Sequence, residues 1–307
     1  MEAVALNSGF HPGYDGTKLF VEHAVSGHKI NVLLCDGIGC DGFIWTYLLP
    51  DLIQFANVIH PHMRGHGQSD SPTNLEHLRM SDFAHDLESV LARLVNNEHP
   101  LIILGHSMGV QVALEFIKLY PDRCTAAVFL CGSFEHPATS FHHDDGLARA
   151  LPLLKRLSRS TKSPFGFIWK TALKLPLAFT VAKLTETHPD RTERSIFEPY
   201  LAHLADMNLD VFFRTLDYAN QHSARTYLPN IHMPVLVIAG EDDRMTPPRL
   251  AGELAALLPN ARYLGVTDGT HIAPVEFPNA MNPVVLEFIK RESGKAKTNA
   301  PSTTAEN

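Results

Sequence analysis

One short segment limits the fold of this chain more than any other. Leu101 to Leu104 is an apolar run too short for a helix, which predicts a buried strand. It leads into Gly105-His106-Ser107-Met108-Gly109, and Val110 to Leu119 then has the period of an amphipathic helix. A serine in such a strand-to-helix turn needs both glycines, because a β-carbon at either position would collide with neighbouring backbone.

The rest of the chain alternates short apolar runs with longer helical segments, which is typical of a parallel sheet with crossover helices. The predicted fold class is therefore α/β. Further strands are expected at Lys18 to His23, Ile30 to Cys35, Asn57 to His60, Ala126 to Leu130, Val235 to Ala239 and Arg262 to Val266. Helices are expected at Ser81 to Leu94, beginning with a serine N-cap, and at Met108 to Leu119, Pro248 to Leu258 and Val284 to Arg291. Turn signals before the first two strands predict an antiparallel hairpin between them.

The segment between Cys131 and Pro234 interrupts this alternation. It covers about a third of the chain and is helical in pattern, with no good strand. We predict an inserted helical cap over residues 135–230, with a core made of residues 1–134 and 231–292. Residues 293–307 lack large apolar side chains and are predicted to form a disordered tail.

Composition and charge argue against several classes of protein. The net charge of −7 supplies no positive field for nucleic acid, so no nucleic-acid partner is expected. The first residues lack the basic start and apolar run of a secretory signal, and no apolar stretch is long enough to span a bilayer. Four cysteines without CxxC spacing predict neither a disulfide framework nor zinc. We expect a cytoplasmic protein, and its oligomeric state stays open.

A serine hydroxyl is a weak nucleophile until a base takes its proton and an acid orients that base. Candidates for both follow predicted strands. Asp243 comes just after Val235 to Ala239, and His271 follows Arg262 to Val266 in a Gly-x-His context. Because the carboxyl ends of parallel strands meet at one edge of a sheet, we expect Ser107, Asp243 and His271 to lie together there.

With these motifs the chain resembles the serine hydrolases of the α/β-hydrolase fold, of the esterase and lipase type, from Lys18 to Arg291. The resemblance implies a mostly parallel, eight-stranded type of sheet flanked by helices, with the cap as the variable part. The family pattern G-x-x-D-x-x-x-P falls on Gly240 to Pro247, which makes Asp243 the acid. Asp242 and Glu135 stay open as alternatives. No cofactor is expected.

The oxyanion of the reaction needs N–H donors that are already in place. Met108, the residue after the nucleophile, offers one, and the resemblance puts the second at Ile38. The loop that carries Ile38 begins with Asp36-Gly37, where many relatives have His-Gly. A carboxylate facing the oxyanion would oppose it, so we expect Asp36 to turn away and to accept backbone N–H bonds of its own loop. The residues expected to contact substrate are Gly37, His106 and Trp45.

Two groups of histidines could suggest a metal site. His60, His62 and His66 come without acidic ligands at suitable spacing. The run His142-His143-Asp144-Asp145 has the composition of a solvated turn. We expect no metal at either place.

Between Gly146 and Thr185 the chain has eight basic residues, no acidic residue and many large apolar ones, as in basic amphipathic helices. Two interpretations are open. The apolar residues pack the cap onto the core and the basic face is solvated, or they form an acyl tunnel whose basic rim suits a lipid surface, a fatty acyl ester or an anionic carrier such as coenzyme A. Peripheral membrane contact through this basic cap is therefore one hypothesis.

The first functional hypothesis is a serine carboxylic-ester hydrolase that acts on a small-molecule acyl ester of medium or long chain, through an acyl-enzyme at Ser107. A lactone or acyl-thioester hydrolase is the alternative, suggested by Asp36-Gly37 and by the basic cap respectively. A non-catalytic ligand receptor on the same fold is a third hypothesis. The presence of all three triad residues argues against it.

Overall fold

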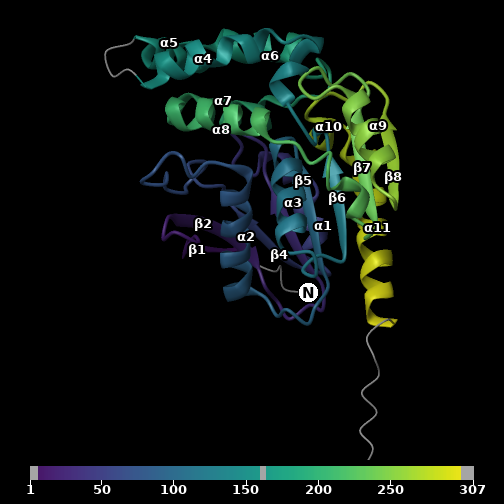
Figure 1. Cartoon of the computed structure of the whole chain (residues 1–307). Coiled ribbons are helices and arrows are strands. Elements are labelled where there is room, and N and C mark those ends of the chain that lie inside the picture. The colour runs from purple at the N-terminus through teal and green to yellow at the C-terminus, as the bar shows by residue number, and fades with distance from the viewer. Residues whose placement is uncertain (1–5, 160–163, 299–307) are drawn as a thin grey trace, which may run out of the picture.

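The computed structural model describes residues 6–159 and 164–298 (Figure 1). Its centre is an eight-stranded sheet in the order β1-β2-β4-β3-β5-β6-β7-β8, in which β3 to β8 run parallel to their neighbours within that group. This confirms the predicted α/β class and its mostly parallel sheet. The strands are β1 (Asn7–Pro12), β2 (Lys18–Ala24), β3 (Asn31–Cys35), β4 (Asn57–Pro61), β5 (Leu101–His106), β6 (Ala126–Leu130), β7 (Val235–Gly240) and β8 (Ala261–Val266).

The first strands are paired differently from the prediction. β2 pairs antiparallel with both β1 and β4, while β3 pairs parallel with β4 and β5. The predicted hairpin between Lys18–His23 and Ile30–Cys35 is therefore wrong, because β4 lies between these two strands. The turn that connects them is held from β4 instead: the N–H groups of Ser26 and His28 both donate to Asn57 Oδ1, at 3.1 Å.

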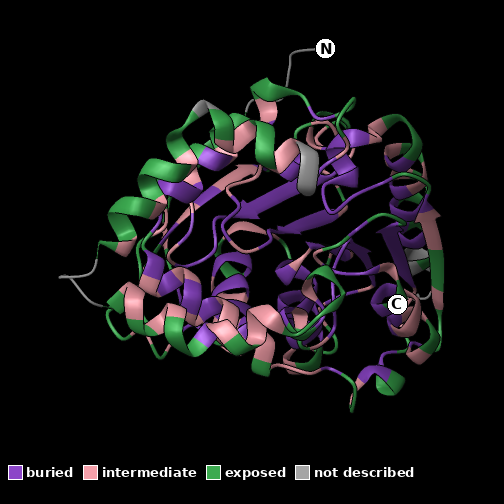
Figure 2. Ribbon diagram, turned by 90° about the horizontal axis from the view of Figure 1, so that it is seen from above, coloured by how far each residue is buried: buried purple, intermediate pink, exposed green. Residues whose placement is uncertain are grey.

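Helices cover both faces of the sheet (Figure 2). The buried side chains form one large cluster on each face. The first cluster packs under α2, α3 and α9, and the second under α1, α10 and α11. These helices are α1 (Leu49–Leu52), α2 (Met80–Leu94), α3 (Met108–Leu119), α9 (Pro248–Leu257), α10 (Ala273–Glu276) and α11 (Pro278–Thr298). Short 3₁₀ turns lie at η1 (Phe43–Trp45), η2 (Pro137–Thr139), η3 (Phe141–His143) and η4 (Leu228–Asn230).

Two predicted helix ends need correction. α2 begins at Met80, so Ser81 lies inside the helix and is not its N-cap. The N-cap is Arg79, whose N–H donates to the Asp82 carboxylate at 2.8 Å. α11 continues to Thr298, where a disordered tail from Ser293 was predicted, and the Ser293 hydroxyl is buried and donates to Ile289 O at 2.8 Å. The rest of the predicted tail, residues 299–307, lies outside the described residues.

The described residues between β6 and β7 form five α-helices and no strand of the sheet. We call α4 to α8 the helical layer. Figure 1 shows α4, α5 and α6 outermost, with α7 and α8 between them and the sheet. The five helices are α4 (Gly146–Arg159), α5 (Phe165–Lys174), α6 (Pro176–Thr185), α7 (Arg194–Asp206) and α8 (Leu209–Gln221).

Among the described residues, no single helix has the length and the apolar composition needed to cross a bilayer. Residues Phe165–Lys174 and Leu177–Lys183 meet these criteria only when joined, and a bend of 79° separates them.

Candidate active site

Ser107 lies in the sharp turn between β5 and α3. Its φ of 55° and ψ of −121° are values that a residue with a side chain rarely adopts. A Cβ at Gly105 would lie 2.6 Å from Gly109 O, and a Cβ at Gly109 would lie 2.1 Å from Cys35 O. Both approaches are far inside van der Waals contact, which confirms the predicted need for two glycines. The turn thus holds the serine at the carboxyl end of the central strands.

The structure brings the three predicted side chains together in one hydrogen-bonded chain. Ser107 Oγ lies 2.9 Å from His271 Nε2, and His271 Nδ1 lies 2.9 Å from Asp243 Oδ2. Because Nδ1 faces a carboxylate, it carries the proton, and the lone pair of Nε2 is left for the serine hydroxyl. This is the arrangement that a base needs in order to deprotonate a serine.

Asp243 is fixed by several donors besides His271. Its Oδ1 accepts the N–H groups of Met245 and Thr246, both at 2.9 Å. The Thr246 hydroxyl lies 2.9 Å from Asp243 Oδ2 and 3.2 Å from His271 Nδ1. Our sequence reasoning missed Thr246. The available signal was its place three residues after Asp243, in a turn of the kind that aspartate favours.

The two alternative acids face elsewhere. Glu135 accepts hydrogen bonds from the Arg225 guanidinium, at 3.1 Å, and from the Ser223 hydroxyl, at 2.7 Å. Asp242 is exposed at the surface. Of the three candidates left open by the sequence, Asp243 is the one in contact with His271.

The backbone of His271 is held from two sides. His106 Nε2 donates to His271 O at 2.9 Å, and the N–H of the preceding Thr270 donates to the buried Glu276 at 3.0 Å. Burial and the neighbouring His271 lower the pKa of His106 to about 3, so its ring is neutral. His106 was predicted to contact substrate. It lines the cavity described below, but its Nε2–H is engaged by His271.

Asp36 turns away from the site, as predicted, but its partners are side chains and not the backbone of its loop. Its two oxygens accept Trp45 Nε1–H, at 2.6 Å, and His60 Nε2–H, at 2.9 Å. Trp45 is therefore committed to the core, where its indole is buried. The prediction that Trp45 contacts substrate is wrong, because this side chain does not line the cavity.

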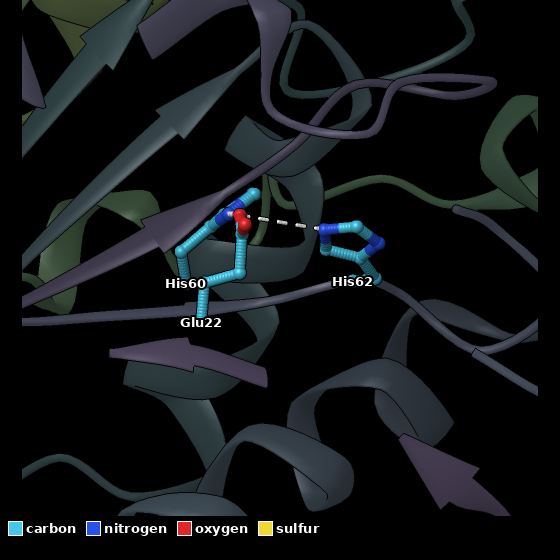
Figure 3. Close-up of side chains that lie close together, drawn as sticks. All are labelled: Glu22, His60 and His62. Atoms are coloured by element: carbon cyan, nitrogen blue, oxygen red, sulfur yellow. Dashed lines mark hydrogen bonds and ion pairs between the residues drawn. The ribbon is translucent and has the colours of Figure 1, made fainter. Parts of the chain in front are cut away.

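His60 lies between two carboxylates. Its Nε2 faces Asp36, and its Nδ1 lies 3.0 Å from Glu22 Oε2 (Figure 3). Burial alone would lower the pKa of His60, but Asp36 and Glu22 outweigh it and raise this pKa to about 10. Although burial opposes the charge of Asp36, the His60 cation lowers the pKa of that carboxyl. The loop that carries Ile38 is thus anchored by a buried ion pair at its first residue.

Glu22, His60 and His62 place three potential ligand atoms within 4.8 Å of one another. Figure 3 shows both imidazole rings beside the Glu22 carboxylate. Their protonation, however, does not fit a metal. Gln68 N–H donates to His62 Nδ1 at 3.0 Å, so His62 Nε2 must carry the ring proton and has no lone pair for a metal. In the second group of histidines, His142 Nε2 lies 3.0 Å from Glu186 Oε1.

A cavity of about 430 Å³ opens onto Ser107 and His271 beneath the helical layer. Ile38 and Met108, the predicted oxyanion donors, both line it. Met108 is the first residue of α3, so its N–H has no acceptor within the helix. Gly37, which was predicted to contact substrate, does not line the cavity. A Cβ there would lie 2.9 Å from Ser107 Cβ, so glycine at this position lets the loop approach the serine.

The walls of this cavity are mainly apolar. None of the described residues that line it is Lys or Arg, and Glu186 is the one carboxylate. The helical layer contributes much of the wall, including Leu147, Leu154, Phe165, Trp169, Phe212 and Phe213.

Comparison with known proteins gives a consistent result. Residues 30–278 match the family model described as alpha/beta hydrolase fold. A pimeloyl-[acyl-carrier protein] methyl ester esterase of Neisseria meningitidis is 27% identical over 260 residues, which cover 84% of this chain and 92% of that protein. The crystal structure of a Pseudomonas aeruginosa hydrolase has a TM-score of 0.74 and 23% identity, covering 92% of this chain and 98% of its own. The enol-lactonase of Burkholderia xenovorans has a TM-score of 0.74 and 19% identity, covering 92% and 100%.

Because Gly109 lies close against β3, adding one methyl group at this position should destabilise the protein. Gly109→Ala should lower the free energy of unfolding by about 3 kcal/mol, because the new Cβ overlaps Cys35 O. Gly252→Ala in α9 is the matched control, since a Cβ there meets no atom within 4 Å and alanine favours a helix. Urea unfolding measures both. Equal stability of the two variants would contradict the packing described for this turn.

The His60 ion pair predicts a pH-dependent stability. Because the pKa of His60 is raised on folding, its stabilisation is complete below the ordinary value of 6.5 and is lost as the pH rises toward 10. His60→Gln leaves Asp36 buried without its cation and should cost about 3–5 kcal/mol near pH 7. Thermal unfolding should show this deficit shrinking as the pH approaches 10.

His77→Gln is the control for this series. His77 Nδ1 also faces a carboxylate, Asp15, at 3.3 Å, but its side chain is 43% exposed. Its substitution should change the melting temperature little at any pH. A deficit of His60→Gln that stays constant over the whole range would argue against a charged His60.

Proposed function

Because the chain belongs to the alpha/beta hydrolase fold family, we propose that it is a serine carboxylic-ester hydrolase that acts on an apolar ester of medium or long acyl chain. One observation carries the proposal: the 2.9 Å contacts from Ser107 to His271 and from His271 to Asp243 lie at an apolar cavity. The similarity to a methyl ester esterase of Neisseria meningitidis supports ester hydrolysis as the reaction.

In the first half of the reaction Ser107 Oγ attacks the ester carbonyl carbon while His271 Nε2 takes the hydroxyl proton. Asp243 stabilises the imidazolium that results. The carbonyl oxygen becomes an oxyanion and accepts the N–H groups of Ile38 and Met108, the latter at the positive end of α3. The tetrahedral intermediate then expels the alkoxide, which takes the proton from His271 and leaves as the alcohol. The acyl group stays on Ser107 Oγ.

The second half uses the same groups with water as the nucleophile. The water oxygen attacks the acyl carbon while His271 Nε2 takes a proton from that water. The N–H groups of Ile38 and Met108 again hold the oxyanion. When this intermediate collapses, the bond to Ser107 Oγ breaks and His271 returns the proton to the serine. The carboxylic acid is released, and the free enzyme is restored.

Besides Ser107, the cavity is lined by a second potential nucleophile, the thiol of Cys40. Burial and the nearby Asp36 raise the pKa of the Cys40 thiol, so it stays protonated. No described base is hydrogen-bonded to it: its Sγ lies 3.7 Å from Ile38 O. These surroundings favour Ser107 as the group that carries the acyl chain.

The walls of the cavity support the choice of substrate. A neutral acyl chain suits apolar walls without Lys or Arg among the described lining residues, whereas a chain that ends in a carboxylate would lose its hydration there. We propose that the helical layer acts as the predicted cap, because α4, α5, α7 and α8 form much of this wall.

Among the described residues, the two features that suggested other substrates do not line the cavity. The Asp36 carboxylate, which suggested a lactone, is engaged by His60 and Trp45. Of the basic residues that suggested an anionic carrier, Lys155 pairs with Asp217 and Arg159 with Asp210, both acids of α8. A carboxylic ester therefore remains the best-supported substrate.

Hydrolysis of p-nitrophenyl esters from acetate to palmitate tests the proposal. The wild type should turn over longer chains faster, and Ser107→Ala should lower kcat by about 10,000-fold or more. Ser133→Ala, a serine that lines the same cavity, should retain most of the activity. If wild type and Ser107→Ala are equally inert at every chain length, the protein is not a simple esterase, and the receptor hypothesis gains.

The choice of acid has its own test. Asp243→Asn should lower kcat by about 10,000-fold, because an amide can force the wrong tautomer on His271. Glu135→Gln is the matched control, since Glu135 contacts Arg225 and Ser223 instead of His271. The kinetics of the same ester series compare the two. A larger loss of kcat in Glu135→Gln than in Asp243→Asn would show that Asp243 is not the acid that orients His271.

A further inference from the structure

α5 is apolar on two opposite faces. Phe165 and Trp169 line the cavity on its inner face. On its outer face Phe167 is 75% exposed, and on the flank of the helix Ile168 is 57% exposed. The solvent face of a surface helix is normally polar, yet α5 exposes large apolar side chains in the outermost layer of the molecule (Figure 1). The outer face of α5 therefore offers an apolar surface for contact with a partner.

This apolar surface continues beyond α5. Leu175, which joins the two helices, is 51% exposed, and Leu177 in α6 is 64% exposed. We call Phe167, Ile168, Leu175 and Leu177 the outer apolar patch. The large exposed apolar residues elsewhere are spread over several elements, from Phe10 in β1 to Tyr263 in β8. Such a concentration of exposed side chains in one short segment marks an interaction site.

The charges beside the outer apolar patch are predominantly positive. Lys170 Nζ and Lys174 Nζ approach the same carboxylate, Asp206, at 2.6 Å and 2.7 Å, so two cations share one anion. Lys183 follows in α6, and the sequence has no acidic residue from Gly146 to Thr185. Since the whole chain carries −7, the eight cations of this segment leave −15 elsewhere. A partner of this surface should therefore be anionic as well as apolar.

We propose that the outer apolar patch docks onto the surface of a lipid bilayer that contains anionic lipids. Apolar side chains of an interfacial helix enter the boundary between headgroups and acyl chains, while lysines beside them attract anionic headgroups. α5 and α6 have ten residues each and meet at a sharp bend, whereas a span needs about 20 apolar residues. The two helices therefore lie on the bilayer and do not cross it.

A second copy of the chain fits this surface less well than lipid. In a two-fold symmetric dimer each patch would face its own copy, so Lys170 and Lys174 would approach the same lysines of the partner. The segment has no acidic residue of its own to oppose them. Lys170 and Lys174 share the single carboxylate of Asp206, and anionic headgroups would add the further negative charge that a second copy of this segment lacks.

Docking would also place the cavity close to lipid. Phe165 and Trp169 line the cavity from the inner face of the helix whose outer face meets the bilayer, and a helix with its side chains is about 10 Å across. A membrane-borne ester would then have a short path to Ser107. This consequence rests on the proposed esterase function, whereas docking itself does not.

Sedimentation with vesicles tests the docking. The full chain should bind vesicles of phosphatidylcholine with phosphatidylglycerol more tightly than vesicles of phosphatidylcholine alone, and salt should weaken this binding. The double variant Phe167→Ser, Ile168→Ser should bind at least about tenfold more weakly, because two large apolar side chains no longer enter the lipid. Lys174→Gln should lower binding to the mixed vesicles about fivefold.

Phe10→Ser is the matched control, because Phe10 is 59% exposed on β1 and lies outside the patch. It should bind like the wild type. Ser107→Ala should also bind vesicles like the wild type. The docking is therefore tested independently of the proposed esterase activity. Circular dichroism verifies that each variant is folded.

Three results would overturn the proposal. The first is a wild type that sediments with neither kind of vesicle, and the second is a double variant that binds as the wild type does. The third is a lipid-free wild type that is a dimer in analytical ultracentrifugation while the double variant is a monomer. That result would assign the patch to a second copy of the chain.

Discussion

The close approach of α3 to the end of β3 is the contact on which the rest of the site depends. Gly109 lies so near Cys35 O that no side chain fits between them, and this closeness sets Ser107 beside the loop that begins at Asp36. The nucleophile and the loop that bears Ile38 are therefore positioned by one packing contact. Neither could shift without moving the other, since β3 and β5 are adjacent parallel strands.

The surroundings of His60, His106 and His271 give these three histidines different roles. His60 is held as a cation between two carboxylates and anchors the loop. His106 is neutral, and its ring centroid lies 5.0 Å from that of His271. A charged His106 would repel the imidazolium that His271 must become during the reaction. His271 alone is placed between a carboxylate and a hydroxyl, where it can take and return a proton.

The parts that could be predicted from the sequence are those governed by local spacing. The turn around Ser107, the acid Asp243 and the base His271 each follow a strand directly, so the parallel sheet brings them together. The errors involve partners that are distant in sequence. β4 separates β2 from β3, and His60 takes the Asp36 carboxylate that was expected to bind its own loop. The basic segment has no acidic residue of its own, and the acid that faces its Lys170 and Lys174 is Asp206 of α7.

The role of Ser107 as the nucleophile can be tested by trapping the acyl-enzyme. The wild type would be mixed with an acyl ester, quenched in acid during turnover and digested for peptide mass spectrometry. One acyl group is expected on the peptide that contains Ser107, formed and lost at rates that match turnover. An acyl group on Cys40, or product formation with no adduct on Ser107 at any time, would contradict this role of Ser107.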